Sequence, residues 1–375
     1  MIAFNKPYLS GKETEYISTA AKSGKISGDG MFTKKCHEFF ENRYHFKKVL
    51  LTTSCSDALE MAAILLDIKE GDEVIVPSFT FVSTANAFVL RGAKIVFADC
   101  EENTPNIDTG KIEALITDRT RVIVPVHYAG MACNMDAIML LAKKYNLFVV
   151  EDAAQAIDSF YQGKPLGSIG HLAAFSFHET KNIISGEGGM LVINDERFVH
   201  RAEIIREKGT NRSAFFRGET DKYGWVDIGS SFLPSDIIAA FLFAQLENIH
   251  EIQERRKIIW NTYYKGLAGI EQNGLARLPQ LPAYAVNNAH MFYLVCKNLE
   301  ERTALISRLK KENIGAVFHY ISLHSSPYYL SRHDGRPLPH ADRFTDCLLR
   351  LPFYFELTEA DQQQVIDVIL DFYGL

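Results

Sequence analysis

Between about residues 48 and 194 the chain alternates short apolar runs with longer amphipathic stretches. The runs are rich in Val, Ile, Leu and Phe and have the length of buried strands: Lys48–Thr52, Glu73–Pro77, Lys94–Ala98, Arg121–Val126, Leu147–Asp152, Ala173–Phe177 and Met190–Asn194. The stretches between the early runs predict the helices Ser56–Leu66, Phe81–Leu90, Lys111–Ile116 and Met135–Tyr145. This alternation predicts an α/β fold with a mostly parallel central sheet and helices on both faces. Ligands of such sheets bind beyond the carboxyl ends of the strands.

The C-terminal part of the chain has a different pattern. A long helical pattern, Ser235–Gly266, follows Pro234 and predicts a helix that joins a large domain to a smaller one. The remainder predicts a smaller α+β domain with strands Phe292–Cys296 and Ala316–Phe318 and helices Leu299–Glu312, Ala341–Leu349 and Thr358–Phe372. Because 375 residues exceed the usual size of a single core, we expect a large domain over residues 1–245 and a smaller one over residues 246–375. The polar, turn-rich stretches Thr210–Gly224 and Ser331–Pro339 predict mobile loops.

Charge and cysteine usage exclude several classes of function. The net charge of −6, from 46 acidic and 40 basic residues, is unlike that of a general nucleic-acid binder. The six cysteines are scattered without a Cys-x-x-Cys pair, which indicates reduced thiols rather than a disulfide framework or a zinc site. The chain starts without a signal-peptide pattern and has no apolar run of membrane-spanning length. We therefore expect a cytoplasmic protein without nucleic-acid or membrane partners.

Lys181 and Asp152 are the candidate catalytic pair. Lys181 follows one apolar strand and precedes the glycine-rich segment Ser185–Gly189, whereas Asp152 ends the strand Leu147–Asp152. A protein that uses pyridoxal phosphate needs a lysine to hold the aldehyde as a Schiff base and a carboxylate to keep the pyridine nitrogen protonated. From the residues alone, Asp152 could equally cap the next helix or join a buried ion pair, and Lys181 could be a surface lysine. Gln155 could bind the cofactor's phenolic oxygen or be an ordinary polar helix residue.

A candidate phosphate site follows the first strand. The segment Thr52–Asp57 opens a helix, and the free backbone N–H groups at a helix N-terminus favour a phosphate. Ordinary capping by Ser56 or Asp57 is the common alternative. Ser176 lies late in another strand and could add a hydroxyl. The chain has no Gly-x-Gly-x-x-Gly dinucleotide fingerprint, no Gly-x-Ser-x-Gly elbow and no His-x-x-x-His spacing, so we expect neither a dinucleotide nor a metal centre.

Taken together, these residues resemble the pyridoxal-phosphate-dependent sugar-nucleotide aminotransferase family, which has an aspartate-aminotransferase-like fold. The similarity extends over nearly the whole chain. The segments that carry it are Gly24–Gly30, Val76–Thr84, Val150–Ala156 and Phe175–Asn182. The last two are specific to the family when they occur together in this order.

The resemblance implies roles for individual residues. Lys181 would bind the cofactor and carry protons, and Asp152 would pair with the pyridinium nitrogen. Gln155 would lie near the phenolic oxygen, and Phe81 would stack on the ring. The residues implied at the phosphate are Cys55, Ser56 and Ser176.

Two further positions follow from the resemblance. His319 and its neighbour Tyr320 lie in the segment that the family uses near the sugar. After Gly229 the family commonly has an aromatic residue, Asn, an aromatic residue and Arg, and the Asn reaches the phosphate of the neighbouring subunit. Here Ser231 replaces that Asn and Leu233 replaces the Arg, so the shorter Ser231 is the expected cross-subunit contact.

The implied activity is amino transfer from L-glutamate to a nucleotide-linked keto-sugar, most specifically a dTDP-linked 4-keto-6-deoxy sugar for cell-surface polysaccharide. The implied assembly is a homodimer with its active site at the subunit interface. Relatives that act as dehydratases have histidine at the lysine position, so Lys181 favours amino transfer. A 3-keto-sugar aminotransferase and a dehydratase remain alternatives. Arg212, Arg217 or Lys222 could meet the diphosphate or be solvated surface charges.

Overall fold

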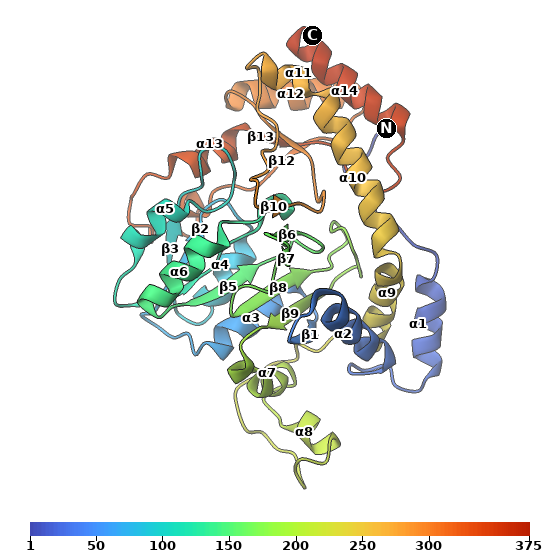
Figure 1. Ribbon diagram of the computed structural model, residues 1–375, viewed down its shortest axis with the longest axis vertical. Helices are drawn as coiled ribbons and strands as arrows, with labels where there is room; N and C mark the ends of the chain where they lie inside the picture. Colours follow the sequence, from blue (N-terminus) through green and yellow to red (C-terminus); the bar gives the residue numbers. More distant parts are fainter.

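The central sheet has seven strands, in the order β1-β9-β8-β5-β4-β2-β3, in a computed structural model that describes residues 1–375 (Figure 1). The strands are β1 (Lys48–Thr52), β2 (Glu73–Pro77), β3 (Lys94–Ala98), β4 (Thr120–Ile123), β5 (Phe148–Asp152), β8 (Leu172–Ser176) and β9 (Gly189–Ile193). Only β9 runs against its neighbours, since it is antiparallel to both β1 and β8, while the other pairs are parallel. The predicted α/β fold with a mostly parallel sheet is therefore confirmed.

Both faces of this sheet are buried, which explains its continuous apolar strands. Side chains alternate between the faces along each strand, so Leu50 joins one core and its neighbours Val49 and Leu51 join the other. Helices α3 (Cys55–Leu65), α4 (Val82–Val89) and α7 (Val199–Arg206) contribute to the first core. Helices α2 (Met31–Tyr44), α6 (Met135–Tyr145) and α9 (Asp236–Glu247) contribute to the second.

Polar residues before the helices set where they begin. The Ser54 hydroxyl accepts a hydrogen bond from the Asp57 N–H and caps α3. The Asn134 side chain caps α6 in the same way through the Ala137 N–H. The capping residue of α3 is thus Ser54, not Ser56 or Asp57, which leaves Ser56 inside the first turn.

Three predicted helices are wrong in detail. The predicted helix Ser235–Gly266 is two helices, because α9 ends before Asn248 and α10 (Ile249–Gly266) begins after it. The Asn248 amide donates to the Ala244 carbonyl and competes with the helical backbone pattern. The predicted helix Ala341–Leu349 ends early, since Leu348 begins the strand β13 (Leu348–Arg350). The stretch Lys111–Ile116 divides into α5 (Thr109–Ile112) and the 3₁₀ turn Glu113–Leu115.

The C-terminal part forms a third core around an antiparallel sheet of order β11-β13-β12. Its edge strands are β11 (Tyr293–Val295) and β12 (Val317–Phe318), and helices α10, α12 (Leu299–Lys311) and α14 (Glu359–Tyr373) contribute to this core. Ile2 also joins it through a β-bridge to Ile314, so the two chain ends lie at the same end of the molecule in Figure 1. The division of the chain at residue 245 stays a prediction.

Several short elements have no clear signal in the sequence. They are α1 (Glu13–Lys22), α8 (Arg212–Phe216), α11 (Ala268–Gln272), β6 (Phe160–Tyr161), β7 (Lys164–Pro165) and β10 (Ala285–Val286). The helix predicted over Ala341–Leu349 is α13 (Pro339–Cys347). Helix α8 lies in the turn-rich stretch 210–224 and projects from the body at the end opposite the C-terminal helices (Figure 1). None of the helices combines the length and the apolar composition that crossing a membrane requires.

Candidate active site

A cavity of about 690 Å³ lies at the carboxyl ends of the central strands and extends to the C-terminal sheet. All but one of the residues predicted for the site line this cavity: Cys55, Ser56, Phe81, Asp152, Gln155, Ser176, Lys181, His319 and Tyr320. The exception is Ser231, which is exposed and forms a β-bridge with Glu207. In a single chain, therefore, Ser231 is not part of the cavity wall.

Strand register brings the predicted phosphate residues together. Gly189 at the start of β9 pairs with Thr52 of β1 on one side and with Ser176 of β8 on the other. A Cβ at position 189 would come within 2.3 Å of the Ser54 carbonyl carbon, so glycine allows the start of α3 to pack against β9. In the first turn of α3 the N–H groups of Cys55 and Ser56 have no partner within the helix, and these two residues line the cavity together with Ser176. This arrangement suits a phosphate group.

Asp152 is a buried carboxylate with a fixed orientation. The Thr84 hydroxyl donates to its Oδ2 at 2.6 Å, and the Ala154 N–H donates to its Oδ1 at 3.1 Å. Burial raises the pKa of Asp152, while these hydrogen bonds and the Lys181 charge act to lower it. The carboxylate forms no ion pair with a protein side chain at hydrogen-bond distance, so it is free to bind a positively charged group in the cavity.

Lys181 presents a half-buried amine to the same cavity. Its Nζ makes no hydrogen bond and no ion pair with the rest of the chain, whereas its backbone N–H closes a turn onto the His178 carbonyl at 2.9 Å. Burial lowers the pKa of Lys181, and Cys55 and Asp152 act in the opposite direction. A lower pKa increases the fraction of free amine, which is the nucleophilic form. Lys181 is therefore not an ordinary surface lysine.

These groups fit pyridoxal phosphate, because one cavity holds an unpartnered amine, an oriented carboxylate and a phosphate cradle. The side chain of Phe81, which is expected to stack on the cofactor ring, is open to solvent in this chain. It is 55% exposed, and its ring centroid lies 6.1 Å from that of Tyr320. A metal centre has less support from the side chains, since no group of three His, Cys, Asp or Glu residues is placed to hold an ion.

Gln155 is more constrained than its predicted role requires. Its Oε1 accepts from the Ala129 N–H at 2.6 Å, and its Nε2 donates to the Tyr320 hydroxyl at 3.0 Å. One amide hydrogen remains for a ligand. Next to it, the Tyr128 hydroxyl and His319 Nδ1 lie 2.6 Å apart, and Tyr320 has a left-handed backbone with φ +46°. A non-glycine residue keeps this conformation only where its surroundings hold it, so the cavity wall around Tyr320 is well ordered.

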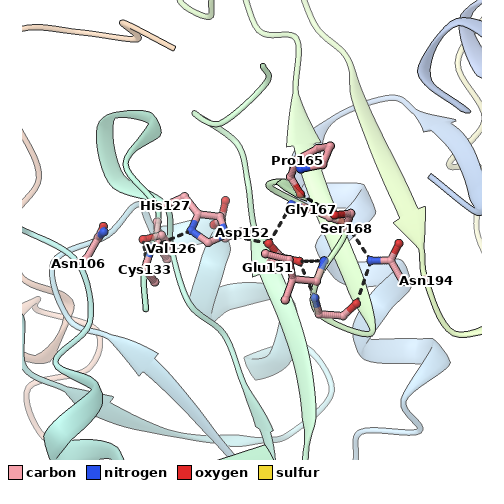
Figure 2. A network of polar contacts seen from close by, with 12 residues as sticks. Asn106, Val126, His127, Cys133, Glu151, Asp152, Pro165, Gly167, Ser168 and Asn194 are labelled. Carbon is pink, nitrogen blue, oxygen red and sulfur yellow. Dashed lines mark hydrogen bonds and ion pairs between the residues drawn. The ribbon is translucent and has the colours of Figure 1, made fainter. Parts of the chain in front are cut away.

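Glu151, the neighbour of Asp152, anchors the strand end from the opposite face of the sheet (Figure 2). Its carboxylate accepts hydrogen bonds from the N–H groups of Gly167, Ile169 and Gly170 at 2.6–2.8 Å.

The Glu151 carboxylate also lies 2.9 Å from His127 Nε2. Because the Cys133 N–H donates to His127 Nδ1, the ring proton lies on Nε2 and is donated to Glu151. The backbone N–H of His127 in turn donates a hydrogen bond to the Asp152 carbonyl, which connects this network to the cavity wall.

The Glu151 network predicts a pH-dependent loss of stability. Burial alone would raise the pKa of Glu151, but His127 and the backbone N–H groups outweigh it and hold the pKa below its usual range. Since this pKa is depressed in the folded state, its stabilisation is present above the unfolded pKa and is lost as pH falls through the folded pKa. Glu151→Gln should therefore lower the free energy of unfolding by about 3–5 kcal/mol at pH 7 and by less below about pH 4.

Urea denaturation across pH 3–8 measures this difference. The control is Glu113→Gln, which breaks an exposed contact to Lys144 and should leave the free energy of unfolding close to that of the wild type. A Glu151→Gln difference as small as the control's, or one that grows as the pH falls, would show that the Glu151 carboxylate does not stabilise the fold.

Several cavity residues were not identified from the sequence, among them Thr84, His290, Thr80 and Arg350. Thr84 lies in the Val76–Thr84 segment that carries the family resemblance, but nothing in that segment indicates a bond to Asp152, 68 positions away. His290 and Arg350 come from the C-terminal part and reach the cavity only through tertiary packing.

Comparisons with known proteins agree with this geometry. The model of the DegT/DnrJ/EryC1/StrS aminotransferase family matches residues 7–370. The spore coat polysaccharide biosynthesis protein SpsC of Bacillus subtilis is 33% identical over 99% of this chain and 96% of its own.

Two solved structures are similar over almost their full length. DesV from S. venezuelae, in complex with a ketimine intermediate, is 30% identical, with a TM-score of 0.91 over 100% of this chain and 99% of its own. Spr1654 from Streptococcus pneumoniae, assigned as a sugar aminotransferase, is 26% identical in its PLP form, with a TM-score of 0.90 over 100% of this chain and 98% of its own. Its PMP form is similarly close, with a TM-score of 0.91.

Proposed function

The chain belongs to the DegT/DnrJ/EryC1/StrS aminotransferase family, and from this premise we propose that it transfers the amino group of L-glutamate to a nucleotide-linked 4-keto-6-deoxy sugar. It is an aminotransferase whose cofactor is pyridoxal phosphate. The observation that carries the proposal is the unpartnered Lys181 amine, which shares one cavity with the oriented Asp152 carboxylate.

When bound, pyridoxal phosphate supplies an aldehyde for covalent attachment and a ring that takes up electrons. Lys181 would hold the cofactor and give way to the amino group of glutamate. It would then take the proton from the α-carbon of glutamate and, in the second half-reaction, deliver a proton to the sugar carbon that receives the amine. Its lowered pKa supports this role, since the free amine is the proton acceptor.

The other residues bind and orient. Asp152 would keep the ring nitrogen protonated, and its bonds to Thr84 and Ala154 hold it in place for that. Ser176 and the backbone N–H groups of Cys55 and Ser56 would bind the phosphate. Phe81 would cover one face of the ring, and Gln155 would use its remaining amide hydrogen for the phenolic oxygen.

For the acceptor, we propose dTDP-4-dehydro-6-deoxy-D-glucose, with dTDP-4-amino-4,6-dideoxy-D-galactose as the product. The cavity volume of about 690 Å³ lies in the usual range for small-molecule sites. His319 and Tyr320 line the cavity, and we propose that they contact the sugar. The name of the relative SpsC supports a role in polysaccharide synthesis.

We also propose a homodimer with the active site at the subunit interface. Exposed apolar side chains near α8 support it: Phe216, Tyr223, Trp225, Val226 and Ile228. An apolar patch of this kind commonly marks a protein contact. Ser231 lies a few residues beyond this patch and is exposed, as a contact to the partner's cofactor phosphate would need.

The test of the substrate is incubation of the holoenzyme with glutamate and a panel of dTDP- and UDP-linked 3-keto and 4-keto sugars. We expect release of 2-oxoglutarate with the dTDP-linked 4-keto-6-deoxy sugar, and NMR of the product should place the amine at C4. A product aminated at C3 would favour the 3-keto-sugar alternative. A deoxygenated sugar formed without 2-oxoglutarate would favour a dehydratase.

A further inference from the structure

Two buried threonine hydroxyls lead to the Asp152 carboxylate from the N-terminal end of α4. The Thr84 hydroxyl lies 2.6 Å from Asp152 Oδ2, and the Thr80 hydroxyl lies 2.9 Å from that of Thr84. Both threonines line the cavity, and neither is more than 2% exposed. The Thr80 side chain has no hydrogen-bond partner other than Thr84. We refer to Thr80 and Thr84 together as the hydroxyl chain.

The directions of these two hydrogen bonds follow from the number of hydrogens. A hydroxyl has one hydrogen to donate and two lone pairs that accept. An ionised Asp152 can only accept, so the single Thr84 hydrogen is donated to its Oδ2. Thr84 then has no hydrogen left, and the hydrogen between the two threonines comes from Thr80. Both hydrogens of the hydroxyl chain therefore point toward the carboxylate.

A neutral Asp152 would leave this arrangement unsatisfied. A proton on Oδ2 would be donated to Thr84, and the Thr84 hydrogen would turn toward Thr80. The Thr80 hydrogen would then have no acceptor, because its side chain has no second partner. A proton on Oδ1 would weaken the oxygen that accepts from the Ala154 N–H at 3.1 Å. Since a buried donor without a partner is costly, the hydroxyl chain favours the ionised carboxylate.

The burial of Asp152 acts in the opposite direction. Burial raises the pKa of Asp152, and the Thr84 hydroxyl is the largest of the influences that lower it. The other titratable groups that face this carboxylate, each from a different segment, are Lys181, His127, Cys55 and Tyr320. None of their side chains makes a hydrogen bond to the carboxylate. Thr84 and the Ala154 N–H are its only donors, so the charge depends most directly on them.

We propose that the hydroxyl chain keeps Asp152 ionised, with Thr80 as a positioning residue that acts through Thr84. An ionised Asp152 leaves the proton on the ring nitrogen of the cofactor, where it lets the ring take up electrons. The inference rests on the proposed function, because it concerns the carboxylate assigned there to the ring nitrogen. Thr80 and Thr84 thereby determine the charge of the group that pairs with the cofactor.

A titration of Asp152 in the full-length apoenzyme tests this role without turnover. Carboxyl-¹³C aspartate is incorporated, and the Asp152 signal is the one that is missing from Asp152→Asn. Thr84→Val removes the hydroxyl at nearly constant shape and should raise the proton affinity of Asp152 by about 10- to 100-fold, the range for a hydrogen bond to a charged group. Thr80→Val should raise it by about 2- to 10-fold, as for a bond between neutral groups.

The double variant separates the hydroxyl chain from two independent effects. Without Thr84, Thr80 has no path to the carboxylate, so Thr80→Val should add no further change in the Thr84→Val background. Thr84→Ser keeps a hydroxyl and should restore most of the wild-type proton affinity. The matched control is Thr104→Val, which removes a buried hydroxyl that donates to Glu101 outside the cavity and should leave the Asp152 titration unchanged.

The pH dependence of the glutamate half-reaction gives a second readout in the holoenzyme. Because the reaction needs the ionised carboxylate, a higher proton affinity moves the loss of activity on the acidic side to higher pH. Thr84→Val should show this shift, and Thr84→Ser should return the profile to that of the wild type. A role in packing alone would lower the melting temperature of the variants without moving the profile.

An Asp152 proton affinity within about 2-fold of wild type in both valine variants would overturn the proposal. So would a Thr80→Val effect that persists undiminished in the Thr84→Val background. If Thr84→Val does not fold, Thr84→Ala and Thr80→Val carry the same comparison. Failure of the proposed function is distinguishable, because wild-type enzyme would then release no 2-oxoglutarate, while the apoenzyme titration needs no substrate.

Discussion

Replacing Lys181 with alanine should lower the rate of amino transfer by at least about 10⁴-fold, because the variant loses both the covalent attachment of the cofactor and the group that moves protons. The rest of the cavity stays in place, since the Lys181 amine contributes no hydrogen bond to the fold. Cofactor added to the variant should still bind through the phosphate cradle and Asp152. The measurement is single-turnover release of 2-oxoglutarate, together with the absorption spectrum of the bound cofactor.

The matched control for this prediction is Lys164→Ala, which removes an exposed lysine in β7 and should leave the rate within about 2-fold of wild type. Turnover by Lys181→Ala close to that of the control would show that another group carries the proton, and the mechanism proposed for Lys181 would be wrong.

Replacing Asp152 with asparagine should lower the rate of the glutamate half-reaction by about 10³-fold. A full charge at about 4 Å in an effective dielectric of about 20 is worth about 4 kcal/mol, and the amide cannot supply it to the ring nitrogen. The asparagine oxygen can keep the bond from the Ala154 N–H, and the Thr84 hydroxyl can accept a hydrogen bond from the amide nitrogen in place of the one it donates to Asp152. Stopped-flow absorbance after mixing with glutamate gives the rate, and circular dichroism checks that the fold is kept.

A cofactor analogue isolates the charge. Pyridoxal phosphate methylated at the ring nitrogen keeps a positive charge without a carboxylate partner. It should raise the rate of Asp152→Ala, which has room for the methyl group, above the rate of the same variant with the normal cofactor. An Asp152→Asn rate near that of wild type would contradict the role assigned to this carboxylate.

The central sheet could be predicted from the sequence because its strands are buried on both faces and therefore have continuous apolar runs. Lys181, Asp152 and Ser176 could be placed because each lies at or just beyond a strand end, where position in the chain determines position in the fold. The order of the strands in the sheet could not be predicted from the sequence. The pairing of Gly189 with both Thr52 and Ser176 depends on β9 lying antiparallel between β1 and β8.

The helix break, the short strands and the cavity residues that the sequence did not predict depend on tertiary contacts or on weak local signals. Asn248 interrupts a helical pattern without the proline or glycine that usually marks a break. Strands of two residues, such as β6 and β10, are too short to show alternation. Arg350 looks like any arginine in the sequence, and its lack of a counter-ion becomes visible only when β13 lies beside the cavity.

The most direct test of the account follows the amino group itself. Holoenzyme is incubated with ¹⁵N-labelled glutamate and dTDP-4-dehydro-6-deoxy-D-glucose, and the products are examined by ¹⁵N-edited NMR. We predict that the label appears on C4 of the sugar in amounts equal to the 2-oxoglutarate released. Label that remains in glutamate or appears as free ammonia, with no nitrogen on the sugar, would contradict the proposal that this enzyme aminates a nucleotide-linked keto-sugar.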